Sequence, residues 1–183
     1  IITSVTDAVA AHEEYGKYCE YANLHSLRFI VSYSTDAGIV YDDTDRLEME
    51  PPHSYPGKLA KFLYERYKHF NGAADKGLVM LPVELIDDNG IRLKECVMKL
   101  ADLWKLEDGF KAWLNDACVF CSTLVDRIIT GYPKDEEKEL WEQFGYEDDL
   151  IVTGEPFALW VIESEKDISD ELPLVKAGLP VIF

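Results

Sequence analysis

The sequence has few cysteines, few basic residues and no long hydrophobic run. Its four cysteines, Cys19, Cys96, Cys118 and Cys121, are too few and too unevenly spaced for a disulfide scaffold. Cys118 and Cys121 form a lone CxxC, without the further cysteines or histidines that would complete a four-ligand zinc site. We therefore expect a reducing compartment, no bound metal, and two buried thiols one helical turn apart.

Basic residues are outnumbered, with 18 Lys and Arg against 35 Asp and Glu, which gives a formal charge of −17. No basic run interleaves with aromatic residues, so nucleic acid and anionic membrane surfaces are poor partners. No apolar run approaches the roughly 20 residues of a membrane-spanning helix, and the first residues lack the basic flank of a secretion signal. The expected protein is soluble and cytoplasmic.

A glycine-rich turn is also missing. No predicted strand is followed by G-x-G-x-x-G, the usual seat of a dinucleotide pyrophosphate at a helix N-terminus. What the chain does contain is 48% hydrophobic and 12% aromatic residues, enough for one domain with a core. Because no repeat or flexible linker divides the chain, we expect residues 1–183 to form a single domain.

Predicted helices and strands alternate along the chain. Helical spacing covers 7–23, 55–70, 91–104, 107–129 and 135–144, and extended segments cover 27–33, 76–85, 150–154, 157–163 and 179–183. The helix over 55–70 has the clearest start, with Ser54 as N-cap and Pro56 in the first turn. The alternation predicts an α/β fold with a doubly wound, mostly parallel sheet covered by helices on both faces.

Polar residues follow two of the predicted strands, where ligands bind in open α/β sheets. Residues 32–38 (SYSTDAG) offer hydroxyls and small side chains that would let a cofactor ribose or nicotinamide approach the backbone. Residues 84–90 (ELIDDNG) offer Glu84 and Asn89. From the residues alone, each segment is more typical of an ordinary polar turn.

The segment 121–133 (CSTLVDRIITGYP) places an Asp-Arg pair between an apolar helical run and a Gly-Tyr-Pro turn. One interpretation is a helix end at which Arg127 caps carbonyl groups and pairs with Asp126. The other is a functional site beside the turn. Spacing alone favours the helix end.

Four blocks in order carry a resemblance to a known family: 51–72, 81–90, 121–133 and 153–163. Together they resemble the long-chain mannitol dehydrogenase family, and within it the enzymes that interconvert D-tagaturonate and D-altronate with NAD. The fructuronate and mannitol branches of the family are the alternative. An alternative of another class is an acidic interaction domain that kept the fold and lost the chemistry.

Members of that family are much longer than this chain. The resemblance therefore implies an internal piece, the C-terminal part of a Rossmann-like domain. The glycine-rich N-terminal part and the helical C-terminal domain, with its catalytic Lys, would lie outside the sequence. We accordingly expect little or no catalysis from the 183 residues by themselves.

The resemblance also implies roles residue by residue. Ser34, Thr35 and Gly38 match the segment on the nicotinamide side of the cofactor site. Asp126 matches the active-site Asp of the family's Val-Asp-Arg-Ile signature.

The remaining roles depend on the expected substrate. The Asn that polarises the reacting carbonyl in polyol relatives matches Leu85, so Glu84 or Asn89 is expected to replace it. Because a uronate carries a carboxylate, Arg127 is expected to bind it through two parallel hydrogen bonds, and Glu155 to reach the substrate. A sugar acid and a nicotinamide cofactor are thus the expected partners.

Overall fold

The computed structural model describes residues 4–34 and 37–183. In chain order the elements are α1 (Tyr15–Glu20), η1 (Tyr21–Asn23), β1 (Phe29–Ser32), α2 (Tyr55–His69), η2 (Ala74–Lys76), β2 (Val79–Pro82), α3 (Asn89–Leu103), α4 (Asp108–Asp116), β3 (Val119–Phe120), β4 (Ser122–Asp126), β5 (Ile129–Gly131), α5 (Glu137–Phe144), β6 (Thr153–Gly154), β7 (Leu159–Glu163) and β8 (Val181–Ile182). None of the described helices is long and apolar enough to cross a membrane.

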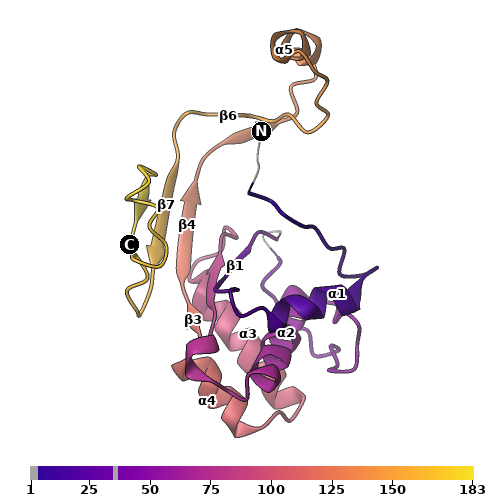
Figure 1. Ribbon diagram of the computed structural model, residues 1–183, viewed down its shortest axis with the longest axis vertical. Helices are drawn as coiled ribbons and strands as arrows, with labels where there is room; N and C mark the ends of the chain where they lie inside the picture. The colour runs from indigo at the N-terminus through magenta and orange to yellow at the C-terminus, as the bar shows by residue number, and fades with distance from the viewer. Residues whose placement is uncertain (1–3, 35–36) are drawn as a thin grey trace.

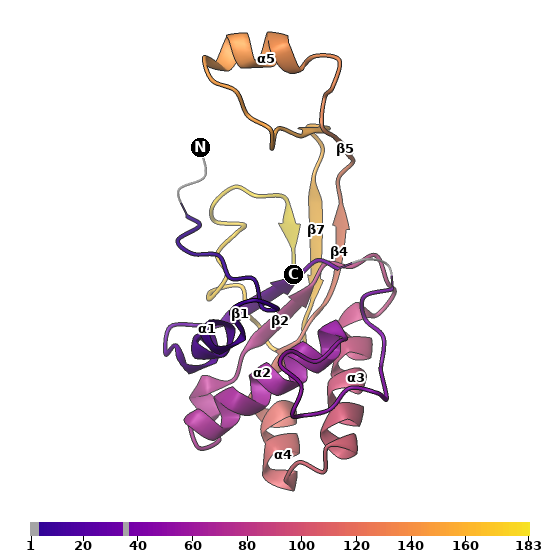
Figure 2. The ribbon, with the colours of Figure 1, turned by 90° about the vertical axis from the view of Figure 1, so that its right-hand side faces the viewer.

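Strands β1, β2 and β3 form a parallel sheet in that order, with Val79 opposite both Phe29 and Val119. Helices α2, α3 and α4 cover one face of this sheet (Figure 2). The main core lies between the sheet and the helices, where Met80 of β2 and Leu63 of α2 are fully buried. The α/β class and the parallel strand order agree with the sequence prediction.

The other face of the parallel sheet is covered differently. Here Leu81 and Val119 pack in a second cluster with Ile162 of β7 and with Ile168 and Leu172 of the segment that follows β7. Within the described residues, helices therefore cover one face, and β7 with the irregular segment that follows it lies on the other, where helices were expected.

An antiparallel arm leaves the sheet at the end of β3. Only Cys121 separates β3 from β4, and β4 pairs antiparallel with β7, from Ser122 opposite Glu163 to Asp126 opposite Leu159. Beyond this ladder β5 pairs with β6, and α5 stands at the far end of the arm (Figures 1 and 2). Residues 122–163 are called the arm below.

The predicted helix over 107–129 is wrong beyond Asp116. The helical spacing stops at Ala117, and the residues that follow are mostly β-branched or apolar and form β3, β4 and β5. Short buried apolar runs do not distinguish helix from strand by periodicity, and β-branched residues favour the pleated sheet. The CxxC cysteines consequently lie in extended chain rather than one helical turn apart.

The predicted helix over 7–23 is also shorter than expected, because α1 begins only at Tyr15. Asp7 instead accepts hydrogen bonds from the side chains of Lys17 and Tyr21, which holds the preceding segment against the helix.

The start of α2 is confirmed, with Ser54 Oγ accepting from Gly57 N at 2.9 Å. A Cβ on Gly57 would lie 2.3 Å from a carboxylate oxygen of Asp45, so this turn needs glycine.

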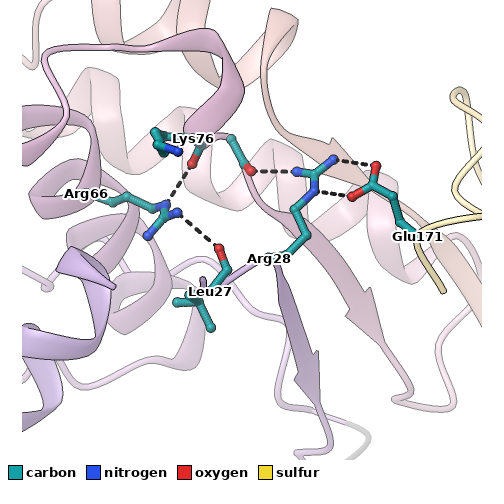
Figure 3. Close-up of polar contacts among 6 residues, drawn as sticks. Leu27, Arg28, Arg66, Lys76 and Glu171 are labelled. Carbon is teal, nitrogen blue, oxygen red and sulfur yellow. Dashed lines mark hydrogen bonds and ion pairs between the residues drawn. The ribbon is translucent and has the colours of Figure 1, made fainter. Parts of the chain in front are cut away.

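Two arginines hold the amino ends of β1 and β2 together (Figure 3). Arg66 is 1% exposed and donates to four backbone carbonyls, those of Ala22, Leu24, Leu27 and Lys76. Arg28 donates to the carbonyl of Gly77 and, through two nitrogens, to Glu171 in the segment between β7 and β8. These contacts fix the end of the sheet opposite to the candidate site.

Candidate functional site

Ser34 and Glu84, two of the polar residues predicted from the sequence, lie after the carboxyl ends of β1 and β2, where ligands bind in open α/β sheets. Gly90, in the first turn of α3, lies directly against the junction of β3 and β4. A Cβ there would be 2.1 Å from the carbonyl oxygen of Cys121, a contact that no other residue type permits. This close approach brings the loop after β2 next to the start of the arm.

Glu84 follows β2 directly after Val83, and the residue is buried, with 2% of its surface exposed. One carboxylate oxygen accepts from Ser32 Oγ at 3.1 Å, and the other accepts from Ser34 Oγ at 2.8 Å and from Ser34 N at 3.0 Å. Among the described residues no Lys or Arg forms an ion pair with it. Glu84 therefore ties the loop after β1 to the loop after β2 through hydrogen bonds alone.

The hydroxyl of Tyr55 is buried nearby and has no hydrogen-bond partner among the described residues. Burial raises the pKa of Tyr55 above its usual value, and the charge of Glu84 adds to the effect. Tyr55 thus remains a neutral phenol close to the buried carboxylate.

Asn89 is fully buried and uses both ends of its amide within the protein. Its nitrogen donates to the carbonyls of Pro82, Glu84 and Thr123, and its oxygen accepts from Thr123 N at 2.9 Å. With these groups occupied, the arrangement favours a structural role for Asn89 over the catalytic role expected from the sequence.

An apolar cavity of about 360 Å³ opens between the parallel sheet and the arm. Val31 and Val83, at the carboxyl ends of β1 and β2, form one side, and Trp160 of β7 lies on the other. Asp126 and Arg127 are also part of its wall, but only through apolar atoms, because the lining surface is apolar throughout. The remaining wall residues are Val125, Ala158, Leu159, Leu179, Pro180 and Val181.

Asp126 and Arg127 are exposed and form no ion pair with each other, nor does either appear in another salt bridge of the described residues. They lie at and just after the end of a strand, so the interpretation as a helix end capped by Arg127 is wrong. Glu155 accepts from Ile128 N at 2.7 Å, and Glu155 N donates to Ile128 O. Glu155 thus holds the backbone next to Asp126 and Arg127 in place.

Gly38 lines a separate cavity of about 520 Å³ beside the start of α2. His53, Ser54 and Lys58 contribute polar groups to this cavity. Thr35, expected near the cofactor, lies outside the described residues.

The predicted residues therefore fall into two groups. Ser34, Glu84 and Asn89 form a connected network, while apolar atoms of Asp126 and Arg127 line the apolar cavity. Val31 lines that cavity, whereas Ser32, the next residue of β1, donates a hydrogen bond to Glu84. The two groups therefore lie on opposite faces of the sheet, as alternation along a strand requires.

Sequence reasoning included Ser32 only as part of the segment 32–38, and it missed Tyr55 and Thr123 as members of the site. The signal for Ser32 was present, because it is a hydroxyl residue at the end of a predicted strand, and Thr123 lies within the segment 121–133 that the sequence singled out. Nothing local marked Tyr55, which reaches the site from α2.

The cysteines and possible metal ligands do not add a further chemistry. Burial raises the pKa of Cys118 to about 11 and also raises that of Cys121, so both remain thiols. Among residues 4–34 and 37–183 no three His, Cys, Asp or Glu side chains are grouped closely enough to hold a metal ion.

Residues 2–176 match the family described as the mannitol dehydrogenase Rossmann domain. The chain is 49% identical over 179 residues to an altronate oxidoreductase of Bacillus subtilis (strain 168), covering 98% of this chain and 37% of that protein. It is 46% identical over 183 residues to the altronate oxidoreductase of Enterobacter sp. (strain 638), covering 38% of it. The chain thus spans little more than a third of the length of these relatives.

Among solved structures, a Pseudomonas fluorescens mannitol 2-dehydrogenase in a ternary complex with NAD and D-mannitol superposes with a TM-score of 0.73 at 20% identity. The match covers 90% of this chain and 35% of that one. A D-sorbitol dehydrogenase in substrate-free form gives a TM-score of 0.72, also at 20% identity, over 94% of this chain and 37% of that one. At this identity the similarity establishes a shared fold.

Proposed function

Since the chain belongs to the mannitol dehydrogenase family through its Rossmann domain, we propose that it forms part of an NAD-dependent oxidoreductase. The reaction is the interconversion of D-tagaturonate and D-altronate by hydride transfer, in cytoplasmic hexuronate catabolism. The observation that carries the proposal is the 46–49% identity to altronate oxidoreductases along nearly the whole chain.

The candidate site fits the nicotinamide half of the cofactor. The apolar cavity between Val31, Val83 and Trp160 suits a flat ring that must react away from water, and it lies at the carboxyl ends of β1 and β2. Bound NADH would supply the hydride. The 183 residues contain no glycine-rich turn for the pyrophosphate, so their contribution to cofactor binding is at the nicotinamide end.

Asp126 and Arg127 lie at the edge of this cavity, where a substrate bound beside the nicotinamide ring would contact them. In this proposal the Asp126 carboxylate accepts hydrogen bonds from substrate hydroxyls and so orients the ketone. The Arg127 guanidinium binds the uronate carboxylate, and Glu155 supports both by holding the backbone at Ile128. A local cation is needed because a protein of charge −17 repels an anionic substrate at long range.

The reaction is tested on the complete polypeptide that carries this sequence. NADH absorbance is followed with D-tagaturonate, D-fructuronate and D-fructose offered separately. Preference for D-tagaturonate supports the proposal, whereas preference for D-fructuronate or D-fructose assigns the protein to another branch of the family. Absence of turnover with all three, together with no NADH binding, would favour a domain that kept only its fold.

The role of Arg127 gives a sharper prediction. Arg127→Gln should raise the KM for D-tagaturonate by about 10- to 100-fold, the loss expected when charge-assisted hydrogen bonds worth about 1.5–3 kcal/mol disappear. The KM for D-fructose, which lacks a carboxylate, should change little. Arg92→Gln on the exposed surface of α3 is the matched control. Equal effects of Arg127→Gln on both substrates would contradict carboxylate binding.

A further inference from the structure

The sheet formed by β4, β7 and β8 packs against the body of the protein through one of its two faces. Its strands are neighbours in that order, and side chains along each strand alternate between the faces. On the inner face Trp160 of β7 lies between Val125 of β4 and Val181 of β8. Trp160 and Val181 are partly buried against the second core cluster, so this face is covered by the protein itself.

The outer face of the same sheet carries a second set of apolar side chains. Leu124, Val161 and Ile182 lie side by side across the three strands, since Val161 is opposite Leu124 on one side and opposite Ile182 on the other. These three residues are called the outer row below. Leu124 is 57% exposed and Ile182 is 55% exposed, and neither belongs to a core cluster of the described residues.

This pattern differs from that of a sheet with one face in water. Such a sheet normally carries polar residues on the solvated face. Ser122 and Glu163, which lie opposite each other at the end of the sheet nearest the body, follow that rule, but the outer row does not. Adjacent exposed apolar side chains on several strands are typical of a surface that another protein segment covers.

The length of the relatives indicates where the covering segment comes from. The chain spans 37–38% of the altronate oxidoreductases that it matches, so more than half of such a polypeptide lies outside these 183 residues. A segment of the same polypeptide is present at high effective concentration. A second copy is disfavoured, because each copy brings a formal charge of −17 and like charges repel.

Glu163 indicates the charge of the covering segment. Its side chain lies on the same face as the outer row, it is exposed, and it forms no ion pair among the described residues. A surface that covers the outer row and reaches Glu163 would match it with a basic side chain.

We propose that the outer row is the docking surface for a segment of the same polypeptide that lies outside these 183 residues. That segment presents apolar side chains to Leu124, Val161 and Ile182, and a Lys or Arg to Glu163. The inference goes beyond the proposed function, because it does not depend on which reaction the protein catalyses.

Hydroxyl-radical footprinting of the complete polypeptide tests the cover without any substitution. Mass spectrometry gives the oxidation rates of Leu124 and Ile182 in the native and in the urea-unfolded protein. With 57% and 55% of their surface free, uncovered residues should react only about twofold more slowly in the native protein than in the unfolded one. Covered residues should react at least about tenfold more slowly.

Dilution identifies the occupant, with the molar mass followed by light scattering. If the same polypeptide covers the row, the slow oxidation should persist in the monomer after roughly hundredfold dilution, because mass action separates only independent copies. Fast oxidation that appears together with a fall in molar mass would assign the cover to a second copy and overturn the proposal.

A charge placed in the row gives an independent test. Leu124→Asp should raise the oxidation rate of Ile182 several-fold, toward that of an uncovered residue, because a buried unpaired carboxylate disfavours docking. Leu150→Asp is the control, since Leu150 is 87% exposed and lies in the arm outside this sheet, and it should leave the Ile182 rate unchanged.

Either of two further results would overturn the inference. One is oxidation of Leu124 and Ile182 at the uncovered rate in the wild-type polypeptide, a result that needs no variant to fold. The other is an unchanged Ile182 rate in a folded Leu124→Asp protein. Turnover of D-tagaturonate by the wild type tests the proposed function separately.

Discussion

At the residue scale, the acidic side chains of the candidate site differ in surroundings rather than in chemical type. Glu84 is buried and surrounded by donors, while Asp126 is exposed on the wall of an apolar cavity. A buried carboxylate whose oxygens are occupied serves best to hold its neighbours, and an exposed one beside a cavity is free to meet a ligand.

The exposure of Asp126 gives a prediction for its substitution. Asp126→Asn should lower kcat by about 100-fold or more if the carboxylate orients the reacting groups. The free energy of unfolding should change by less than about 0.5 kcal/mol, because the side chain is exposed. Steady-state kinetics and thermal unfolding of the complete polypeptide measure the two effects. Unchanged kinetics with a clear loss of stability would show that Asp126 has a structural role instead.

Substitution of Asn89, unlike that of Asp126, should reduce stability. Asn89→Ala removes the partners of Thr123 N and of three carbonyl groups, so we expect a loss of about 2–4 kcal/mol in unfolding free energy. Asp87→Ala, two residues earlier on the exposed surface, is the control. Urea unfolding measures both variants. A stable Asn89→Ala protein that has lost turnover would favour the catalytic role.

At the scale of elements, contacts between segments far apart in sequence decide which strands belong together. The segment after β7 reaches the amino end of β1 through Arg28 and Glu171, and this pair ties the covering layer to the sheet (Figure 3). The hydrogen bonds from Arg28 lower the pKa of Glu171 below its usual value.

That lowered pKa makes the pair sensitive to acid. A carboxyl group with a lower pKa in the folded state contributes its full stability above the ordinary Glu pKa of about 4.3, and loses it as the pH falls through the folded value. Glu171→Gln should therefore cost about 0.2–1 kcal/mol near neutral pH, since both side chains are partly exposed. The difference in unfolding free energy between Glu171→Gln and the wild type should become smaller below about pH 4.

Urea unfolding across a pH series provides the measurement. Asp170→Asn is the matched control, because its pair with Lys176 is largely exposed and should contribute little at any pH. A Glu171→Gln difference that stays constant from neutral to acid pH would rule out a contribution from the ionised pair.

At the scale of the whole molecule, the arm carries its far end away from the parallel sheet (Figures 1 and 2). Helix α5 has no buried residue, and its side chains form no core with the body. Replacing residues 134–150 with a short Gly-Ser linker should therefore change the unfolding free energy of the body by less than about 0.5 kcal/mol. Calorimetric unfolding tests this, and a loss of several kcal/mol would show that the tip supports the body.

The sequence by itself determined the α/β class, the helix over 55–70 with its Ser54 cap, and the presence of polar residues after two strands. These features depend on local propensity, capping and short-range periodicity. The family also followed from the sequence, through blocks whose residues stand in a fixed order.

Only the tertiary structure decided that residues 117–129 extend into an arm, because a buried apolar run takes helix or strand according to the partner that it packs against. It also decided that Glu84 and Asn89 are buried while Asp126 and Arg127 are exposed at the edge of an apolar cavity. Burial and hydrogen-bond partners come from segments distant in the chain, here Ser34, Thr123 and Val31, and no local pattern specifies them.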